Sequence, residues 1–338
     1  MSIDPRTLRH LVLAAALACL LVAGMVLSVT VGYRPLPAAE VLRSLAGIGP
    51  GNPATDLVVQ EIRLPRALIG ALIGGALGMS GAALQGLLRN PLADPGLIGV
   101  SQCAALGAIM VIYFNLTFDA VWVLPAAGMM GALFAAALMQ ALAGRDSGIL
   151  TVILAGVAIG SLASALMALA MNLSPNLWAI REITFWLMGS LKDRSNFEII
   201  AAAPFIAAGM ALLLTCGRGL EALSLGEETA SSLGIGLPGL KIRVVLGTAL
   251  AVGASVAVAG SIAFVGLVVP HLLRPLVGYR PGPLLWISGI AGALLVVFAD
   301  MMTRLVPTNQ ELHLGVLTAL MGAPFFLVLI LRTRWSVR

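Results

Sequence analysis

The chain has 338 residues, of which 59% are hydrophobic and 10% are charged, and its formal net charge at pH 7 is +5. Soluble domains contain about 25% charged residues, so this composition, with a mean hydropathy of +1.02, excludes an ordinary soluble domain. The three cysteines and three histidines are dispersed, and no spacing among them predicts a metal site or a disulfide framework.

Apolar segments of about 20 residues recur along the chain, which is the length that a helix needs to cross a membrane. They are continuous runs rich in Leu, Ala, Val and Gly, without the alternation of β-barrel strands. We therefore predict an all-α, polytopic membrane protein with one transmembrane domain over residues 1–338. Ten spans are predicted, near residues 10–31, 64–88, 94–114, 121–143, 149–171, 197–216, 242–259, 261–277, 284–304 and 314–332.

The first and eighth spans bear on the topology. The first is too long for the apolar core of a signal peptide and lacks a clear cleavage site, so it is interpreted as a true span. Pro270 interrupts the eighth, which is expected to be short and not to cross completely. An even number of spans places both termini on one side. Most of the 20 lysines and arginines fall on that side, which predicts cytoplasmic termini.

Small and turn-forming residues predict local packing. Glycines run through the second span, in "GALIGGALGMSGAALQG" (Gly70 to Gly86), and indicate helices that approach closely in lipid. The segment "RNPLADPG" (Arg89 to Gly96) predicts a rigid inner turn in which Asn90 and Asp94 bond to neighbouring backbone groups.

No sequence feature supplies energy for transport. A phosphate-binding loop of the G-x-x-x-x-G-K type needs Lys directly after Gly, but the only lysines, Lys192 and Lys241, follow leucines. Asp300 is the main carboxylate within a span, and Arg304 one turn later predicts a structural salt bridge rather than a proton relay. We expect no catalytic residues, cofactor or nucleic-acid partner, and expect a separate ATPase to drive the protein.

The segment from Leu220 to Gly234 predicts a short amphipathic helix on the cytoplasmic side. Ser224 and Glu227 match a capping box, and Gly234 is placed to end the helix. A second short helix is expected at the start of "IGLPGLKIR", before span seven. Such a helix is marginal alone in water, so its apolar side must pack on something. A lid on the protein's own loops and a coupling helix for an ATPase remain equally open from these residues.

The motifs, taken in order, resemble the permease subunits of binding-protein-dependent ABC importers for iron–siderophore complexes, haem and cobalamin, the FecCD type. The resemblance runs from about residue 62 to 331. It rests on "RLPRALIGALIGGALGMSGAALQGLLRNPLADPGLIGVS", "LAGVAIGSLASAL", "FWLMGSL", "LSLGEETASSLG", "AFVGLVVPHLLRPLVG" and "ELHLGVLTALMGAPFFLVLI". The resemblance implies a type II ABC importer permease fold and a homodimer with the pathway between its subunits. It also implies two cytoplasmic ATPase subunits and an external substrate-binding protein.

The resemblance also implies roles for particular residues. Arg63, Arg66 and Arg304 match positions that receive carboxylates from the binding protein, a pairing suited to the arginine fork. Coupling helices to the ATPases are implied at about 220–241. The coupling residues are Leu223, Leu225, Gly226, Glu227, Glu228, Ala230, Leu233 and Gly234. A gate is placed in the loop between spans four and five, at Ser147, Gly148, Ile149, Leu150 and Thr151.

The leading hypothesis is the permease subunit of an ATP-driven importer for an iron chelate, either a siderophore complex or haem, in a bacterial inner membrane. Cobalamin is the nearest alternative substrate. A secondary transporter or channel working alone is the alternative from a different class. His313 stands where the family usually has proline, and this sequence gives no role to it or to His271.

Overall fold

The computed structural model describes residues 4–32, 36–48, 52–116, 122–144, 148–174, 176–306 and 312–336. Within these ranges the chain is helical and contains no strand. The helices are α1 (Pro5–Thr30), α2 (Ala38–Ala46), α3 (Pro53–Leu57), a π-helical turn η1 (Val58–Arg63), α4 (Leu64–Leu87), a 3-10 turn η2 (Pro95–Ile98), α5 (Val100–Tyr113), α6 (Val123–Ala143), α7 (Ile149–Asn172), α8 (Leu177–Leu187), α9 (Asn196–Leu214), α10 (Gly217–Leu223), α11 (Glu227–Ser232), α12 (Leu237–Ala259), α13 (Val265–Leu273), α14 (Pro281–Leu305) and α15 (Leu314–Ser336).

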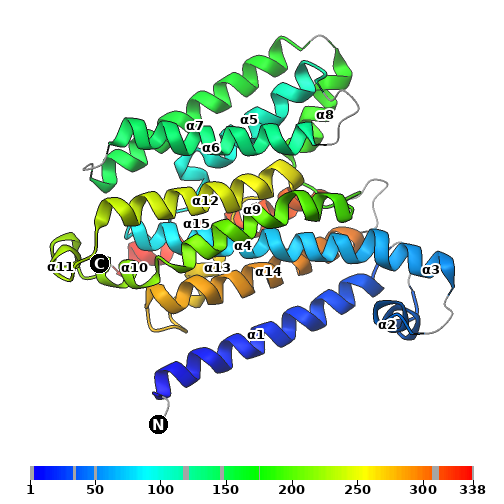
Figure 1. Cartoon of the computed structure of the whole chain (residues 1–338), viewed down its shortest axis with the longest axis horizontal. Helices are drawn as coiled ribbons and strands as arrows, with labels where there is room; N and C mark the ends of the chain where they lie inside the picture. The colour runs from blue at the N-terminus through cyan, green and yellow to red at the C-terminus, as the bar shows by residue number, and fades with distance from the viewer. Residues whose placement is uncertain are drawn as a thin grey trace.

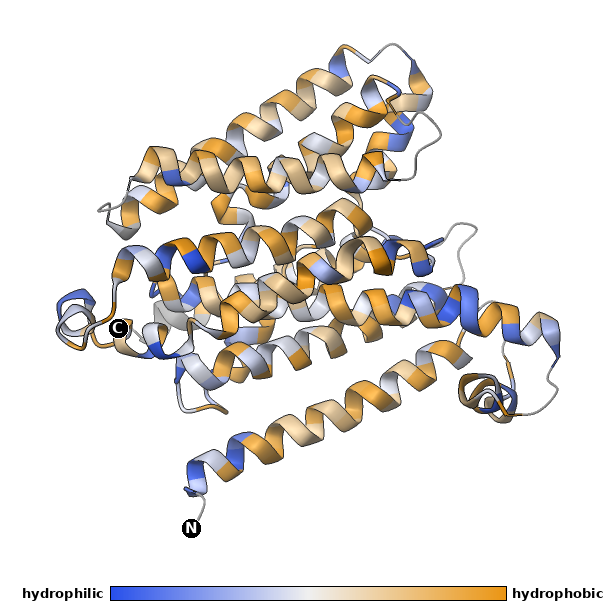
Figure 2. Cartoon of the chain, viewed as in Figure 1, coloured by the Kyte–Doolittle hydropathy of each residue, from blue (hydrophilic) through white to orange (hydrophobic). Residues whose placement is uncertain are grey.

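The prediction of an all-α polytopic bundle is confirmed. Among the described residues, seven helical stretches are long and apolar enough to cross a membrane: α1, the continuous stretch Pro53–Leu87, α6, α7, α9, α12 and α14. The helices α5 and α15 are shorter apolar helices at predicted spans. In Figure 2 hydrophobic residues dominate the helix bodies, and hydrophilic residues gather towards the helix ends.

The eighth predicted span is a short helix, as expected, but proline is not what shortens it. The nine residues of α13 rise about 14 Å, less than half of a hydrocarbon core about 30 Å thick. Pro270 lies inside this helix, which continues to Leu273. Gly260 and Phe264 have left-handed backbones, with φ of +71° and +68°, so the preceding segment is irregular and the helix starts late.

The helices α4 and α14 form the most extensive helix pair of the described structure. Their backbones touch at glycines: a Cβ added at Gly74 would lie 2.2 Å from the carbonyl oxygen of Gly292. One added at Gly78 would lie 2.2 Å from that of Ser288. The close packing predicted from the glycine-rich second span is therefore confirmed, and no side chain lies between the helices at these points.

Figure 1 shows α1 along one edge of the bundle, α5, α7 and α8 at the opposite edge, and α4, α9, α12 and α14 between them. Both chain ends lie at the end of the bundle that carries α10 and α11, while α2, α3 and α8 lie at the other end. Termini at one end agree with the predicted even number of crossings. Following the predicted orientation, we call the end with α10 and α11 the inner end and the opposite end the outer end.

Candidate functional site

The outer end holds three arginines and one buried carboxylate, which we call the outer arginine cluster (Arg63, Arg66, Arg304 and Asp300). Arg66 Nε and Nη2 donate to the carboxylate of Asp300 at 2.9–3.0 Å. Arg304 Nη2 lies 3.1 Å from Oδ2 of the same carboxylate, and the side chain of Asp300 is only 2% exposed. The predicted salt bridge between Asp300 and Arg304 is confirmed. The sequence did not reveal that Arg66, 234 residues away, is the second partner.

Two of these arginines also complete the C-terminal end of α1. The last carbonyl oxygens of a helix have no partner within the helix and carry a partial negative charge. Arg63 Nη1 donates to two of them, on Val29 and Thr30, at 2.9 Å each. Arg304 Nη1 donates to those of residues 28 and 31 at 2.9 and 3.0 Å. Arg63 and Arg304 therefore fasten α1 to η1, which leads directly into α4, and to α14.

The predicted docking role of the three arginines stays a prediction, but their positions are now defined. All three lie at the outer end, where a binding protein would arrive. Arg63 and Arg304 are 8% and 9% exposed, and the side chain of Arg66 is 11% exposed. Their guanidinium groups already form hydrogen bonds and ion pairs within the chain, so a carboxylate of the binding protein must compete with these contacts.

At the inner end, the segment from Leu220 to Gly234 contains a helix boundary that the sequence did not predict. The predicted capping box is wrong: Ser224 ends α10, and its hydroxyl donates to the carbonyl of Glu221 at 2.6 Å. Gly226, with φ of +114°, lies between the two helices and is the residue before α11, where glycine is needed for this backbone conformation. A complete capping box occurs elsewhere, at Ser195 and Glu198, where it starts α9.

The end of α11 agrees with the prediction, and the second short helix does not. Gly234 has φ of +80°, and its N–H donates to Ser231 O while that of Ile235 donates to Ala230 O, at 2.9 and 3.0 Å, which closes the helix. The separate helix expected before span seven is wrong, because α12 runs without a break from Leu237 through that span.

The coupling residues divide into a buried and an exposed set. Leu223 is 2% exposed and Ala230 is fully buried, so these side chains hold α10 and α11 to the bundle. Leu225 and Leu233 are 67% and 62% exposed at the inner end. Glu228 is exposed as well. The hypothesis of a lid that packs on the protein's own loops explains only the buried side chains. The exposed side chains of Leu225 and Leu233 form an apolar surface that no described residue covers.

The predicted gate lies at the start of α7. Gly148 is the residue before the helix, and its carbonyl accepts from the N–H of Thr151 at 3.1 Å. Leu150 is 68% exposed, and Thr151 is exposed too. Ile149 begins the helix, and Ser147 lies outside the described residues. Their role as a gate stays a prediction.

The inner turn between α4 and α5 has the predicted bonds. Asn90 Oδ1 accepts from the N–H of Leu92, and Asp94 Oδ1 accepts from that of Gly96, each at 2.9 Å. The third predicted span begins later than expected, at Val100, because residues 95–98 form a 3-10 turn instead of an α-helix.

Sequence reasoning missed the role of Gln85, a 2% exposed side chain on α4. Since Pro270 has no N–H, the carbonyl of Gly266 lacks its normal helical donor in α13. Gln85 Nε2 donates to this carbonyl and to that of Leu267, at 3.3 and 3.2 Å. Its Oε1 accepts from Arg274. One side chain thus compensates for the proline and joins α4 to α13.

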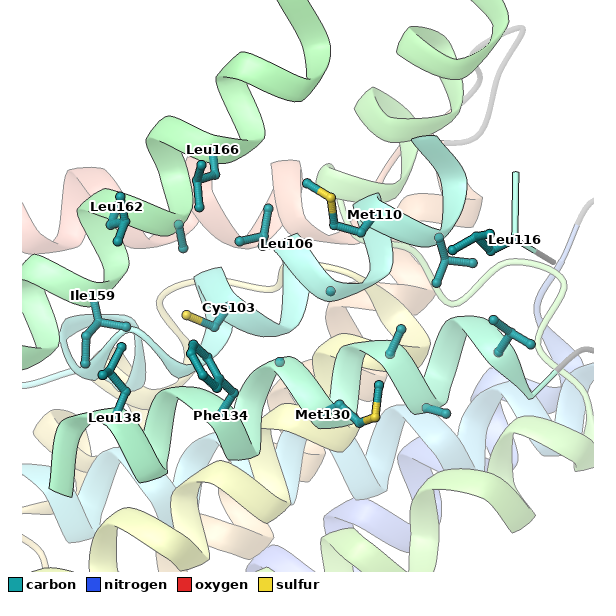
Figure 3. A pocket seen from close by; sticks show the side chains of 17 residues that line it. Cys103, Leu106, Met110, Leu116, Met130, Phe134, Leu138, Ile159, Leu162 and Leu166 are labelled. Carbon is teal, nitrogen blue, oxygen red and sulfur yellow. The ribbon is translucent and has the colours of Figure 1, made fainter. Parts of the chain in front are cut away.

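A groove of about 670 Å³ lies between α5, α6 and α7. Figure 3 shows Leu106 and Met110 from α5, Phe134 from α6, and Leu162 and Leu166 from α7 around it. Every residue that lines it is apolar apart from the thiol of Cys103. The groove offers apolar contact area without a charged group that could fix the orientation of a ligand.

The chain matches a known family over most of its length. The sequence profile of the FecCD transport family covers residues 20–332. The chain belongs to the FecCD transport family. It is 34% identical over 323 residues to the uncharacterized ABC transporter permease protein YvrB of Bacillus subtilis, covering 92% of this chain and 91% of that protein.

Further relatives of this FecCD protein carry functional names. It is 39% identical over 281 residues to the vitamin B12 import system permease protein BtuC of Vibrio cholerae, covering 82% and 84% of the two chains. It is also 39% identical over 278 residues to the hemin transport system permease protein HmuU of Yersinia pestis, covering 81% and 83%. A solved structure of an inward-facing ABC transporter, assigned to the metal-chelate type, aligns with a TM-score of 0.84 and 31% identity over 94% of this chain and 98% of that one.

These similarities establish the class of transporter to which the chain belongs. The chain is the permease subunit of an ABC importer of the FecCD family, with the fold of an ABC transporter permease. Membership of this family favours the importer over a secondary transporter or channel that works alone.

Proposed function

We propose that this permease carries an iron chelate, either a siderophore complex or haem, across the bacterial inner membrane by alternating access. The observation that carries the proposal is its similarity along nearly the whole chain to permeases of ABC importers, including one named for hemin and a structural relative of the metal-chelate type. A groove without charged side chains suits a bulky ligand that must bind weakly and leave.

Cobalamin is the second candidate substrate. Relatives that are 36–39% identical to this chain are named as vitamin B12 or cobalamin import permeases, in both bacteria and Halobacterium salinarum. Haem and cobalamin are both large metal chelates, so the same apolar path suits either one. The choice between them rests on the binding protein that delivers the substrate.

The energy comes from two ATPase subunits that dock at the inner end. Leu225 and Leu233 supply the apolar part of the docking surface, and Glu228 adds an exposed charge beside it. Because Leu223 and Ala230 hold the same two helices to the bundle, a displacement of the exposed side would be passed to the spans. This arrangement is that of an amphipathic helix set into a groove of a partner.

The binding protein docks over the outer arginine cluster. Its carboxylates compete with Asp300 for Arg66 and Arg304, so docking rearranges a buried ion pair as well as forming surface contacts. Arg63 and Arg304 also bond to the end of α1, so a change of their partners on docking would change how α1 packs on the bundle. A second copy of the chain completes the pathway between two subunits, and both termini lie in the cytoplasm.

Reconstitution tests the proposal. The permease, its ATPase and its binding protein are placed in proteoliposomes, and ATP hydrolysis and uptake are measured with haem, a ferric siderophore and cobalamin in turn. Stimulation and uptake with haem or the siderophore support the leading proposal, and a response to cobalamin alone replaces it by the second candidate. Uptake driven by a proton gradient without ATPase or binding protein overturns both.

A further inference from the structure

The first turn of α14 is joined to α10 by an ion pair at the inner end. Arg280, the residue before α14, donates from Nε and Nη2 to one carboxylate oxygen of Glu221, at 3.2 and 3.1 Å. A Cβ added at Gly282 would lie 2.8 Å from the same oxygen. The carboxylate therefore lies against the glycine at the N-terminal end of a 25-residue helix, where a negative charge is favoured.

Two apolar contacts fix the rest of α10. Leu220 is fully buried, and its methyl groups would lie 3.4 Å from a Cβ added at Gly86, near the inner end of α4. Leu240, at the start of α12, packs against Gly219, where an added Cβ would lie 2.9 Å from it. The helix α10 is thus held at once by α4, α12 and α14, whereas the exposed Leu225 and Leu233 lie on either side of α11.

Two of the three helices that hold α10 at the inner end, α4 and α14, also carry three members of the outer arginine cluster. Arg66 lies on α4 and Asp300 and Arg304 on α14, and α14 spans about 37 Å from end to end. Because the backbones of α4 and α14 touch at their glycines, we expect the two helices to move together. The inner end of the α4–α14 pair contacts α10, and its outer end carries Arg66 and Arg304 of the predicted docking site for the binding protein.

We propose that Glu221 and Arg280 are positioning residues that link the ATPase side to the α4–α14 pair, and through this pair to the outer arginine cluster. This inference rests on the proposed function. Arrival of the binding protein at the outer end changes the position of α10 at the inner end, and hence ATP hydrolysis, through this ion pair. By linkage, an altered position of α10 changes the affinity for the binding protein as well.

The exposure of the ion pair argues that its role is coupling and not stability. The side chains of Arg280 and Glu221 are 48% and 32% exposed, and exposed ion pairs contribute little to folding. Loss of the pair is therefore expected to leave the bundle folded with α10 less firmly held. A residue that acts only on stability would not change the response to the binding protein.

The experiment measures binding-protein-stimulated ATP hydrolysis in the reconstituted complex of permease, ATPase and binding protein. Glu221→Gln removes the charge, and Gly282→Ala keeps both charges but displaces the carboxylate, in a helix that alanine favours. Arg243→Ala is the matched control, since Arg243 is a half-buried inner arginine whose side chain donates to a carbonyl of its own helix. Glu221→Arg combined with Arg280→Glu tests rescue.

We expect both variants to lose stimulation roughly 5-fold, the lower end of typical coupling between sites, with ATPase co-purification retained. The control keeps wild-type stimulation, and the exchanged pair regains part of it. Wild-type stimulation in both variants overturns the inference, as does loss of ATPase co-purification, which would make the pair part of the docking surface. Absence of stimulation in the wild-type complex instead overturns the proposed function.

Discussion

Replacing Asp300 by asparagine tests the outer arginine cluster most directly. The carboxylate accepts from Arg66 at 2.9–3.0 Å and from Arg304 at 3.1 Å, and it is 2% exposed. Asparagine has nearly the same shape but no charge, and its amide nitrogen faces guanidinium donors. Leaving a buried ion pair without one partner costs about 3–5 kcal/mol, and we expect the free energy of unfolding to fall by this amount.

The assay is unfolding by SDS in mixed micelles, followed by helical circular dichroism. Glu61→Gln is the matched control, because Glu61 is an exposed outer carboxylate that accepts from the amide of Asn196, and its change is expected to stay within about 0.5 kcal/mol. A double-mutant cycle of Asp300→Asn with Arg66→Met is expected to give a coupling of about 0.5–3 kcal/mol.

A free energy of unfolding of Asp300→Asn within about 0.5 kcal/mol of the wild-type value, the range of an ordinary surface substitution, would contradict this expectation. Additive effects in the cycle would show that Arg66 and Asp300 do not share one interaction in the folded protein. Either result would remove the structural role that the contacts assign to the outer arginine cluster.

Three further outcomes follow from the structure. The double substitution Leu225→Ser and Leu233→Ser is expected to abolish co-purification of the ATPase. Because both side chains are exposed, the free energy of unfolding is expected to change by less than about 0.5 kcal/mol. Retained association with the ATPase would contradict this prediction. Gln85→Leu leaves the carbonyl of Gly266 without its donor and is expected to cost about 1–3 kcal/mol in the SDS assay. Gly234→Ala is expected to cost about 1–2 kcal/mol because of its left-handed backbone. Its control, Gly239→Ala at an open helical position, is expected to stabilise by about 0.5–1 kcal/mol.

Features that depend on neighbouring residues were predictable from the sequence. The apolar spans, the helix stop at Gly234 and the turn bonds of Asn90 and Asp94 all follow from chemistry within a few residues. The pairing of Asp300 with Arg304 belongs to the same class, since four residues separate them on one helix face. Such signals do not need the fold to be known.

Features that depend on distant partners were not predictable. Arg63 and Arg304 bind carbonyls that lie 33 to 276 residues away in the chain, and nothing local to either arginine indicates those acceptors. The capping pattern at Ser224 failed because the left-handed Gly226 moved the helix start beyond the serine.

The attachment of α1 has a consequence for biogenesis. Its final carbonyls accept hydrogen bonds from Arg304, which leaves the ribosome 276 residues after Ser28. At about 5–20 residues per second, this interval is on the order of tens of seconds. During synthesis Arg63 can bond the carbonyls of Val29 and Thr30 early, but those of Ser28 and Val31 must wait for Arg304, so a nascent chain stalled before the ninth span cannot complete this terminus.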